Sequence, residues 1–582
     1  MNDSAATPDQ VSAKDITARQ QGAFSAWWAS GAPWVWLNAG AVAISILLVA
    51  GLLMLIAVRG LGHFWPASVM ETVYQPPGKE RMVVLGQMTS REDVTSARLH
   101  SAGLPVDQDK ETYGRSLIKV GNRDIGSADF VYVIDEWLGV PAYPDHALVI
   151  ERREWGNLYG YLLNVKRAGN TVAEGENAWQ AFQESLDRSN RLFDEIRDIE
   201  KHDIGAINYK MEQLRLDTRR LELDFERDGK DPALIRNTEE FAAIQAKRAE
   251  LDKQYGELQT RLNKLYSDIG RDSYVVETAQ GVTREFPFSK AVRGFRPNEM
   301  SLLDKSGFYL LKVWEFVSDE PREANTEGGI FPAIFGTVMM VILMSIFVTP
   351  FGVVAALYLR EYAHQGWLTR TIRVAVNNLA GVPSIVYGVF GLGFFVYFLG
   401  GNIDQLFFPE ALPSPTFGTP GMLWASLTLA LLTLPVVIVA TEEGLARIPR
   451  ALREASLALG ATKAETLWRV VLPMASPAMM TGLILAIARA AGEVAPLMLV
   501  GVVKLAPSLA LDANAPFLHL DRKFMHLGFH IYDVGFQSPN VEAARPLVYA
   551  TAFLLVLVIV ALNLAAVRIR NHLREKYRSL EH

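Results

Sequence analysis

The sequence predicts an α-helical polytopic membrane protein that also carries a large exported α+β domain. The first observation behind this fold class is a set of six apolar segments, each close to the roughly 20 residues that a membrane helix needs. The second is a long polar stretch, residues 59–329, between the first two segments. The six segments run roughly Val35–Val58, Ile330–Leu359, Ile372–Leu399, Met422–Ala440, Met474–Val503 and Pro546–Val567.

Composition narrows the class of function. The chain has 582 residues, and half are hydrophobic, so a membrane part is joined to a sizeable soluble part. It has no cysteine, which excludes disulfides, zinc–thiolate sites, cysteine-ligated iron–sulfur clusters and thiol nucleophiles. Its net charge of −6 does not suit a nucleic-acid binder. The first apolar segment follows residues 1–34 and is too long for a signal peptide, so we interpret it as an anchor.

The short loops predict the orientation, because lysine and arginine gather on the cytoplasmic side. The loop after the third segment, residues 400–421, has neither residue, whereas the loops after the second and fourth segments and the tail at 568–582 are basic. We therefore expect both termini and the loop at 442–473 in the cytoplasm. The expected divisions are an N-terminal segment (1–34), a first span (35–58), an exported insertion (59–329), a membrane domain (330–567) and a basic tail (568–582).

The flanks of the insertion have the pattern of strands. Short β-branched and aromatic runs alternate there with glycine- and asparagine-containing turns, which is typical of antiparallel sheets. The runs are Phe130–Ile134, Ala147–Glu151, Leu158–Val165, Ser273–Glu277 and Gly307–Val313.

The middle of the insertion, about residues 177–268, predicts an antiparallel coiled-coil hairpin. Apolar residues recur there at alternating spacings of three and four, and Arg227–Pro232 holds the glycine and proline needed to reverse the chain. Arg248 interrupts the seam. The seam residues are Phe193, Ile196, Ile207, Met211, Leu214, Leu221 and Phe225 in one arm, and Phe241, Ile244, Leu251, Tyr255, Leu258, Leu262 and Leu265 in the other. The hairpin could serve as a spacer, as a docking arm for a binding protein or as an oligomerisation device.

The loop between the fourth and fifth segments is charged, helix-prone and amphipathic. We expect a helix at Ile448–Thr462 and a second at Lys463–Val471, with a turn at Gly460. Glu454, Arg453 and Arg469 are expected at the surface, and Pro473 at the start of the next span. Such a helix pair suits docking to a soluble partner; the alternative is an amphipathic loop that lies on the lipid headgroups.

Charged and polar residues within the apolar segments are candidates for a substrate pathway. Arg489 falls near the middle of the predicted fifth span, and Glu493 follows one helical turn later on the same face. A guanidinium suits phosphate or sulfate because its planar fork donates paired hydrogen bonds. Asn377 and Ser384 leave polar groups in the third span that need a partner or a water-lined cavity. The alternative for each is a structural contact between helices.

A phosphate-binding loop is absent from the sequence. Gly78-Lys79 and Gly229-Lys230 are followed by acidic residues, where such a loop has serine or threonine. Any ATP hydrolysis therefore belongs to another polypeptide, and we expect no enzyme activity, metal or cofactor on this chain.

The loop also carries a motif: Glu454, Ala455, Ser456 and Gly460 are followed by Leu472-Pro473. It resembles the E-A-A-x3-G-x9-I-x-L-P loop of permease subunits from ATP-binding-cassette (ABC) importers, and differs only at Ser456 and Val470. The runs Gly328–Pro332, Leu357–Tyr362, Gly381–Gly388, Thr441–Glu443 and Ala488–Glu493 are similar to the A-type (PstA) permease subunits of bacterial phosphate importers.

This resemblance covers about residue 330 to the C-terminus, and implies a type I importer fold in the bacterial inner membrane with the insertion in the periplasm. It implies a second, PstC-like permease, a PstB-like ATPase pair that binds ATP and magnesium, and a PstS-like phosphate-binding protein. The motif residues then form the ATPase-docking loop. Another oxyanion, such as sulfate or molybdate, is a same-fold alternative. A membrane-anchored envelope scaffold or sensor that works through the coiled coil is the alternative of a different class.

Overall fold

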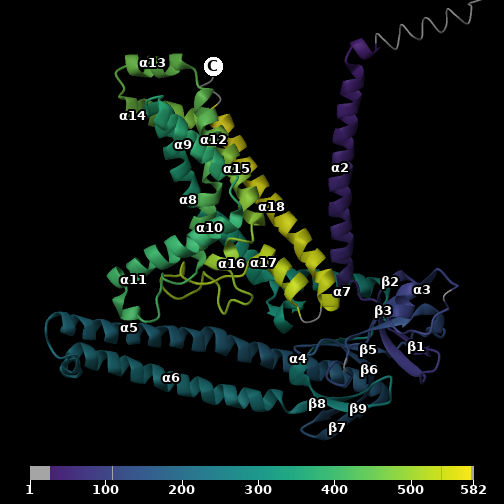
Figure 1. Ribbon diagram of the computed structural model, residues 1–582. Coiled ribbons are helices and arrows are strands. Elements are labelled where there is room, and N and C mark those ends of the chain that lie inside the picture. Colours follow the sequence, from purple (N-terminus) through teal and green to yellow (C-terminus); the bar gives the residue numbers. More distant parts are fainter. Residues whose placement is uncertain (1–26, 108, 127, 539–540, 578–582) are drawn as a thin grey trace, which may run out of the picture.

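The structure is a computed structural model that describes residues 27–107, 109–126, 128–538 and 541–577 (Figure 1). Most of the expected N-terminal segment (1–34) and the end of the basic tail (568–582) lie outside these ranges. Within them, six helices are long and apolar enough to cross a membrane. They are Ala32–Phe64, Phe331–Tyr362, Ser384–Phe407, Met422–Ala446, Lys463–Gly492 and Ala544–Lys576.

The helices at the core of the membrane domain are α8 (Phe331–Leu357), α12 (Met422–Ala446) and α15 (Leu472–Gly492), which pack against one another. The long helix α18 (Val541–Tyr577) covers α15. Helix α2 (Ala32–Leu61) stands apart from this core and contacts α18 near its own end. A Cβ added at Gly60 would lie 2.6 Å from the backbone nitrogen of Ala550, so glycine permits this close crossing.

The third predicted span, Ile372–Leu399, is wrong at both ends. Helix α9 (Trp367–Leu379) stops before Pro383, and a new helix begins with α10 (Ser384–Phe390) and ends with α11 (Gly401–Phe407). Proline has no N–H to donate and disfavours helical backbone in the residue before it, so the chain breaks there. The span is therefore Ser384–Phe407, and α9 is a separate amphipathic helix.

The fifth predicted span, Met474–Val503, is also displaced. The continuous helix runs from Lys463 to Gly492 and ends where Glu493 adopts extended backbone, with ψ at 135°. A short helix, α16 (Leu497–Val500), follows Pro496. The helix ends at Gly492, four residues before Pro496, because proline cannot donate the i→i−4 hydrogen bond to this carbonyl and its ring clashes with it.

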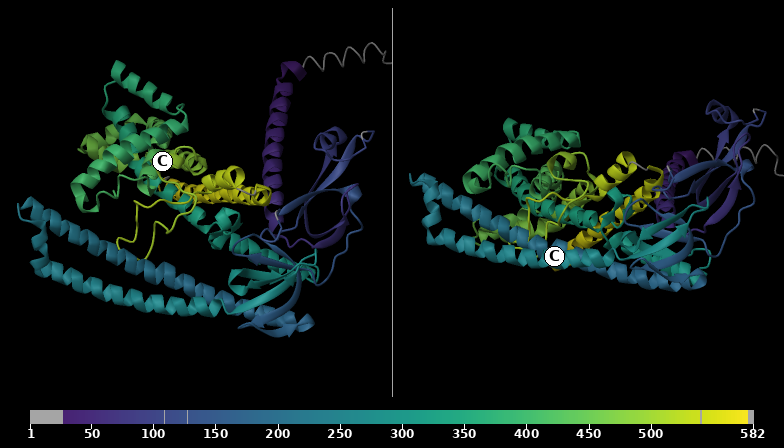
Figure 2. Two further views of the ribbon diagram at one scale, coloured as in Figure 1. Left: turned by 60° about the horizontal axis from the view of Figure 1, so that its bottom comes forward. Right: turned by 90° about the horizontal axis from the view of Figure 1, so that it is seen from below.

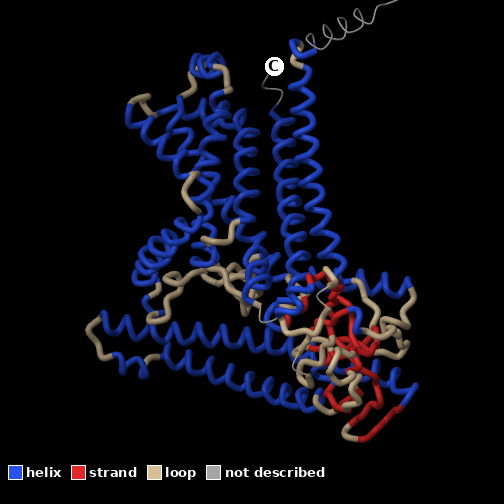
Figure 3. Tube along the Cα trace, turned by 45° about the vertical axis from the view of Figure 1, so that its right-hand side comes forward, coloured by secondary structure: helices blue, strands red, loops and turns tan. Residues whose placement is uncertain are grey.

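The insertion carries its strands at one end of the molecule (Figure 3). A four-stranded antiparallel sheet has the order β1 (Met70–Tyr74), β2 (Met82–Thr95), β3 (Thr112–Lys119) and β4 (Phe130–Ile134). A second sheet has the order β10 (Ala291–Phe295), β5 (Leu148–Arg152), β6 (Leu158–Arg167), β8 (Asp272–Glu277) and β9 (Thr283–Pro287), with β7 (Asn170–Glu174) paired to β6. Helix α3 (Ser96–Ser101) follows β2.

The strand predicted at Gly307–Val313 is wrong, because this segment lies inside the helix α7 (Leu302–Ser318). Ser301 and Asp304 form a reciprocal capping box that starts the helix. The apolar run then continues on more than one face of α7, so its alternation resembled that of a strand. A small pair, β11 (Pro321–Arg322) and β12 (Glu327–Gly328), connects α7 to α8.

A long helical hairpin projects from the second sheet (Figure 2). One arm is α4 (Ala178–Asp198), which continues through residues 199–204 into α5 (Gly205–Arg227), and the other is α6 (Glu239–Ile269). Near the sheet the arms share a buried cluster of Ile196, Ile199, Leu262, Leu265 and Ile269. Toward the tip the seam residues are mostly half-buried, and Arg248 is exposed.

The hairpin lies across the end of the membrane domain that is opposite the motif loop (Figures 1 and 2). Arg220 of α5 pairs with Glu410 at 2.6 Å, and Glu410 is itself almost fully covered. Burial raises the pKa of Glu410, but the hydrogen bond from Arg220, a backbone hydrogen bond and the charge of Arg220 together lower the pKa below its ordinary value. Tyr209 packs against the ring of His519 at 5.8 Å and donates a hydrogen bond to the carbonyl of Ala515.

Reversing the charge of Arg220 is expected to release the hairpin from the membrane domain. Arg220→Glu places two carboxylates together where Glu410 is covered, and the charge-swapped pair Arg220→Glu/Glu410→Arg is expected to restore the contact. The absence of cysteine allows a direct measurement: Tyr209→Cys and Ala515→Cys are introduced and linked with a short bismaleimide. Compared with the protein that keeps Arg220 and Glu410, linking should drop in Arg220→Glu and recover in the charge-swapped pair. Equal linking in these three proteins would show that this ion pair does not hold the hairpin.

Candidate functional site

The motif loop folds as a compact helix–turn–helix at the end of the bundle away from the insertion (Figure 1). Helix α13 (Arg450–Ala458) is shorter than the predicted Ile448–Thr462. Gly460 then has φ at 90°, a left-handed conformation that favours glycine. Thr462 caps α14 (Lys463–Thr466) in a second capping box with Glu465. The helix continues without a break through Leu472 and Pro473 into α15.

The inner side of the loop is fixed to the membrane domain by polar and apolar contacts. Arg453 pairs with Glu361 at 3.1 Å, so the prediction of a surface position for Arg453 is wrong. The Lys463 ammonium donates to the carbonyl of Glu361 at 2.6 Å, and the hydroxyls of Ser456 and Thr466 lie 2.9 Å apart. Both helices of the loop are therefore held in one orientation.

The outer side of the loop is open and partly apolar. Glu454 and Ala455 are exposed, and so are two large side chains, Leu459 at 90% and Trp468 at 75%. Exposed apolar side chains in an otherwise charged loop indicate a surface that a partner covers. Leu459 and Trp468 carry no motif that marks them in the sequence, although both lie on the solvent side of the predicted helices.

Arg489 and Glu493 lie at the far end of the same helix. Their side chains approach to 3.7 Å, and each is partly exposed. The predicted mid-span position of Arg489 is wrong, because α15 ends at Gly492 and Arg489 is in its last turn. Free backbone carbonyls at a helix C-terminus favour a cation, which reduces the cost of placing this charge in the bundle.

The segment after α15 packs against α10. A Cβ on Gly388 would lie 2.7 Å from the Cα of Pro496, so the two segments cross at close range. Ser384 begins α10, and the buried Tyr387 donates a hydrogen bond to the carbonyl of Leu379 at 2.7 Å. Non-helical backbone inside a membrane domain is expected where it lines a cavity or is buried in protein.

Asn377 lies on α9 and not on the helices that carry Ser384 and Arg489. It is exposed on α9 and lines a cavity of about 130 Å³ together with Arg373 and Glu442, which pair at 3.2 Å. Within the described residues, no group of three or more His, Asp or Glu side chains is placed to hold a metal ion.

Known proteins match the membrane part of this chain. Residues 348–579 match the family "Binding-protein-dependent transport system inner membrane component". A PstA 1 phosphate transport permease of Mycobacterium tuberculosis is 36% identical over 244 residues, which cover 42% of this chain and 71% of the relative. The probable ABC transporter permease YqgI of Bacillus subtilis is 30% identical over 44% of this chain and 81% of the relative.

A solved structure also aligns at low similarity. The inward-facing MetNI methionine ABC transporter matches 45% of this chain and 97% of its own with a TM-score of 0.31 and 20% identity. The sequence relatives alone carry the assignment. The chain belongs to the family of binding-protein-dependent transport inner-membrane components, as a PstA-type permease subunit of an ABC importer and not an enzyme.

Proposed function

We propose that this chain is the permease subunit through which an ATP-driven importer moves inorganic phosphate across the bacterial inner membrane. The observation that carries the proposal is one continuous helix, Lys463–Gly492, with an exposed docking surface at one end and Arg489 at the other. A push on the loop moves this helix as a rigid body. The printed names of the relatives, phosphate transport permeases, support phosphate as the substrate.

The docking loop is proposed to seat in a PstB-like ATPase subunit that holds the ATP and magnesium. Glu454 and Ala455 lie on its exposed surface and Gly460 forms its turn, and Leu459 and Trp468 add apolar contact area. Ser456 holds the two helices together through Thr466, and Leu472-Pro473 join them to the span. Docking to a cytoplasmic ATPase requires that the loop and the ends of the described chain face the cytoplasm. The insertion then faces the periplasm.

The pathway proposal assigns phosphate recognition to Arg489. Its guanidinium donates paired, charge-assisted hydrogen bonds to a tetrahedral oxyanion. Glu493 orients the guanidinium, since their side chains lie 3.7 Å apart. The Ser384 hydroxyl and the Asn377 amide are proposed as further polar groups along the route, one at the start of α10 and the other on α9. A PstC-like permease would complete the pathway.

A PstS-like binding protein is proposed to deliver phosphate at the face of the membrane domain next to the insertion. The hairpin contacts Glu410 and Ala515 on that face. The binding protein would therefore meet the hairpin as well as the loops of the permease.

Co-purification tests the importer proposal against a scaffold or sensor. The chain is purified in mild detergent from cells that express its own partners, and the retained subunits are identified. We expect an ATPase subunit and a second permease in the preparation. In a separate uptake assay, we expect unlabelled phosphate, but not sulfate or molybdate, to compete with labelled phosphate. Absence of any nucleotide-binding subunit would refute the importer, and equal competition by sulfate would refute the substrate.

A further inference from the structure

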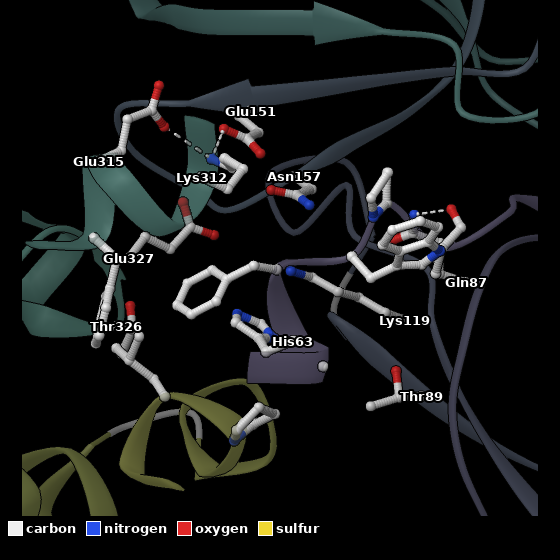
Figure 4. A pocket seen from close by; sticks show the side chains of 18 of the residues that line it. His63, Gln87, Thr89, Lys119, Glu151, Asn157, Lys312, Glu315, Thr326 and Glu327 are labelled. Carbon is white, nitrogen blue, oxygen red and sulfur yellow. Dashed lines mark hydrogen bonds and ion pairs between the residues drawn. The ribbon is translucent and has the colours of Figure 1, made fainter. Parts of the chain in front are cut away.

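A cavity of about 360 Å³ lies where the insertion meets the ends of two membrane helices (Figure 4). Phe64, just after α2, and Leu547, near the start of α18, line one side of it. Lys119 of β3 and Phe316 of α7 line the others. The cavity therefore sits where α2 and α18 meet the folded insertion, at the boundary of the membrane.

Two oppositely charged side chains, Lys119 and Glu327, face this cavity without forming an ion pair. Lys119, Asn157 and Glu327 point into the same space (Figure 4). Among the described residues, neither Lys119 nor Glu327 lies within 4.0 Å of an oppositely charged side chain. By contrast Lys312, on the same wall, is held by Glu151 at 2.6 Å and Glu315 at 3.4 Å. The Lys119 ammonium and the Glu327 carboxyl group are thus available to a ligand.

The surroundings favour a ligand that carries both charges. Burial alone would lower the pKa of Lys119, but its neighbours, with Tyr159 and Glu327 foremost, raise it above its ordinary value. Burial raises the pKa of Glu327, so a cation beside this carboxyl group would restore its charged form. Glu327 would repel a simple anion placed beside it, and Lys119 would repel a metal ion.

Donors and acceptors are divided across the cavity in the same way. Gln87, Thr89 and Asn157 lie toward the Lys119 side, whereas Glu327 and Thr326 lie toward the other (Figure 4). A phosphodiester would take hydrogen bonds from the first side, and an ammonium would donate to the second. The volume suits a headgroup rather than a whole lipid.

The helix beside the cavity has an apolar face that is open to its surroundings. Leu303, Leu310 and Trp314 of α7 are 85%, 67% and 68% exposed, and their spacings of seven and four place them on one side of the helix. The opposite side of α7 packs Phe316 against Phe64 at 5.0 Å. Such a helix lies in the membrane interface, where aromatic residues are also enriched.

We propose that the cavity binds an aminophosphate group, a phosphodiester linked to a primary ammonium, supplied by a phospholipid of the leaflet next to the insertion. The phosphate lies against Lys119 and the ammonium against Glu327. The acyl chains follow the apolar wall at Phe64 and Leu547 toward the membrane. The bound lipid holds the insertion against the bilayer at the C-terminal end of α2.

Lipid titration of the delipidated complex tests this proposal. Phosphatidylethanolamine or phosphatidylglycerol is added in detergent, and bound lipid is counted by native mass spectrometry for the wild type, Lys119→Met and Glu327→Gln. We expect one tightly held phosphatidylethanolamine in the wild type, and about tenfold weaker binding in each variant, because each loses a charge-assisted hydrogen bond. Lys166→Met, which removes a lysine paired with Glu285 elsewhere on the insertion, is the matched control and should bind as the wild type does.

Two further arms identify the source of the group. Soluble phosphoethanolamine that raises the melting temperature as much as the lipid does would overturn the lipid assignment. Phosphatidylglycerol bound as tightly as phosphatidylethanolamine would overturn the requirement for an ammonium. Unchanged lipid binding in both Lys119→Met and Glu327→Gln would overturn the site. Glu327→Gln keeps the side-chain shape, so unchanged binding in this variant alone overturns the site where Lys119→Met fails to fold.

Discussion

Replacing Arg489 by alanine is expected to lower ATP-driven phosphate uptake at least about tenfold while the complex remains assembled. A hydrogen bond to a charged group contributes about 1.5–3 kcal/mol, and a tenfold effect corresponds to about 1.4 kcal/mol. Arg489 is partly exposed in the last turn of α15, so its removal leaves no fully buried partner unpaired. The measurement is the initial rate of radiolabelled phosphate uptake in vesicles that contain the complete complex.

Two companion variants separate recognition from structure. Arg489→Lys keeps the positive charge but loses the planar fork, so it should fall between the wild type and Arg489→Ala. Glu493→Gln keeps the size of the side chain that orients the guanidinium, and should lose less than Arg489→Ala. Normal uptake in Arg489→Ala, with every subunit retained, would contradict the pathway role of this residue.

The double variant Leu459→Ser/Trp468→Ala is expected to abolish retention of the ATPase without unfolding the permease. Both side chains are exposed, at 90% and 75%, so the folded chain loses little when they are replaced. A partner surface that buries them loses most of two large apolar contacts, at about 25 cal/mol per Å². ATPase retained on the tagged permease is counted by quantitative mass spectrometry, and the melting temperature of the permease is recorded beside it.

A matched control exists on the other side of the molecule. Val140 is 94% exposed in the insertion, and Val140→Ser should leave both ATPase retention and stability unchanged. Gly460→Val tests the same loop through its backbone, because a β-branched residue is strained at φ of 90°. Full ATPase retention in the double variant would show that the partner docks elsewhere.

Much of the membrane domain could be predicted, because its signals are local. Apolar length located the spans, and Gly460 indicated the turn in the motif loop. The sequence predicts a separate helix at Lys463–Val471 before a span that begins at Pro473, whereas the two form one continuous helix. The residues at which the helices end could not be predicted as well. An apolar run has the same composition on both sides of a break, so the sequence predicts uninterrupted spans across the breaks before Ser384 and after Gly492.

The errors in the predicted sites have separate causes. The apolar pattern predicts a mid-span position for Arg489 because it runs on past Glu493, whereas Pro496 cannot bond to the carbonyl of Gly492 and the helix ends there. Arg453 was expected at the surface, but its partner Glu361 is distant in sequence, and such pairs are not visible in local patterns. The cavity at Lys119 is built from β2, β3, α7 and the ends of α2 and α18, so its existence depends wholly on the tertiary fold.

Reconstituted transport tests the central proposal most directly. The complete complex is placed in lipid vesicles with ATP on the side of the motif loop and with phosphate and its binding protein on the other side. We predict phosphate accumulation that requires ATP hydrolysis and is not reduced by excess sulfate or molybdate. ATP hydrolysis without phosphate movement, or sulfate carried as fast as phosphate, would contradict the assignment of this chain to phosphate import.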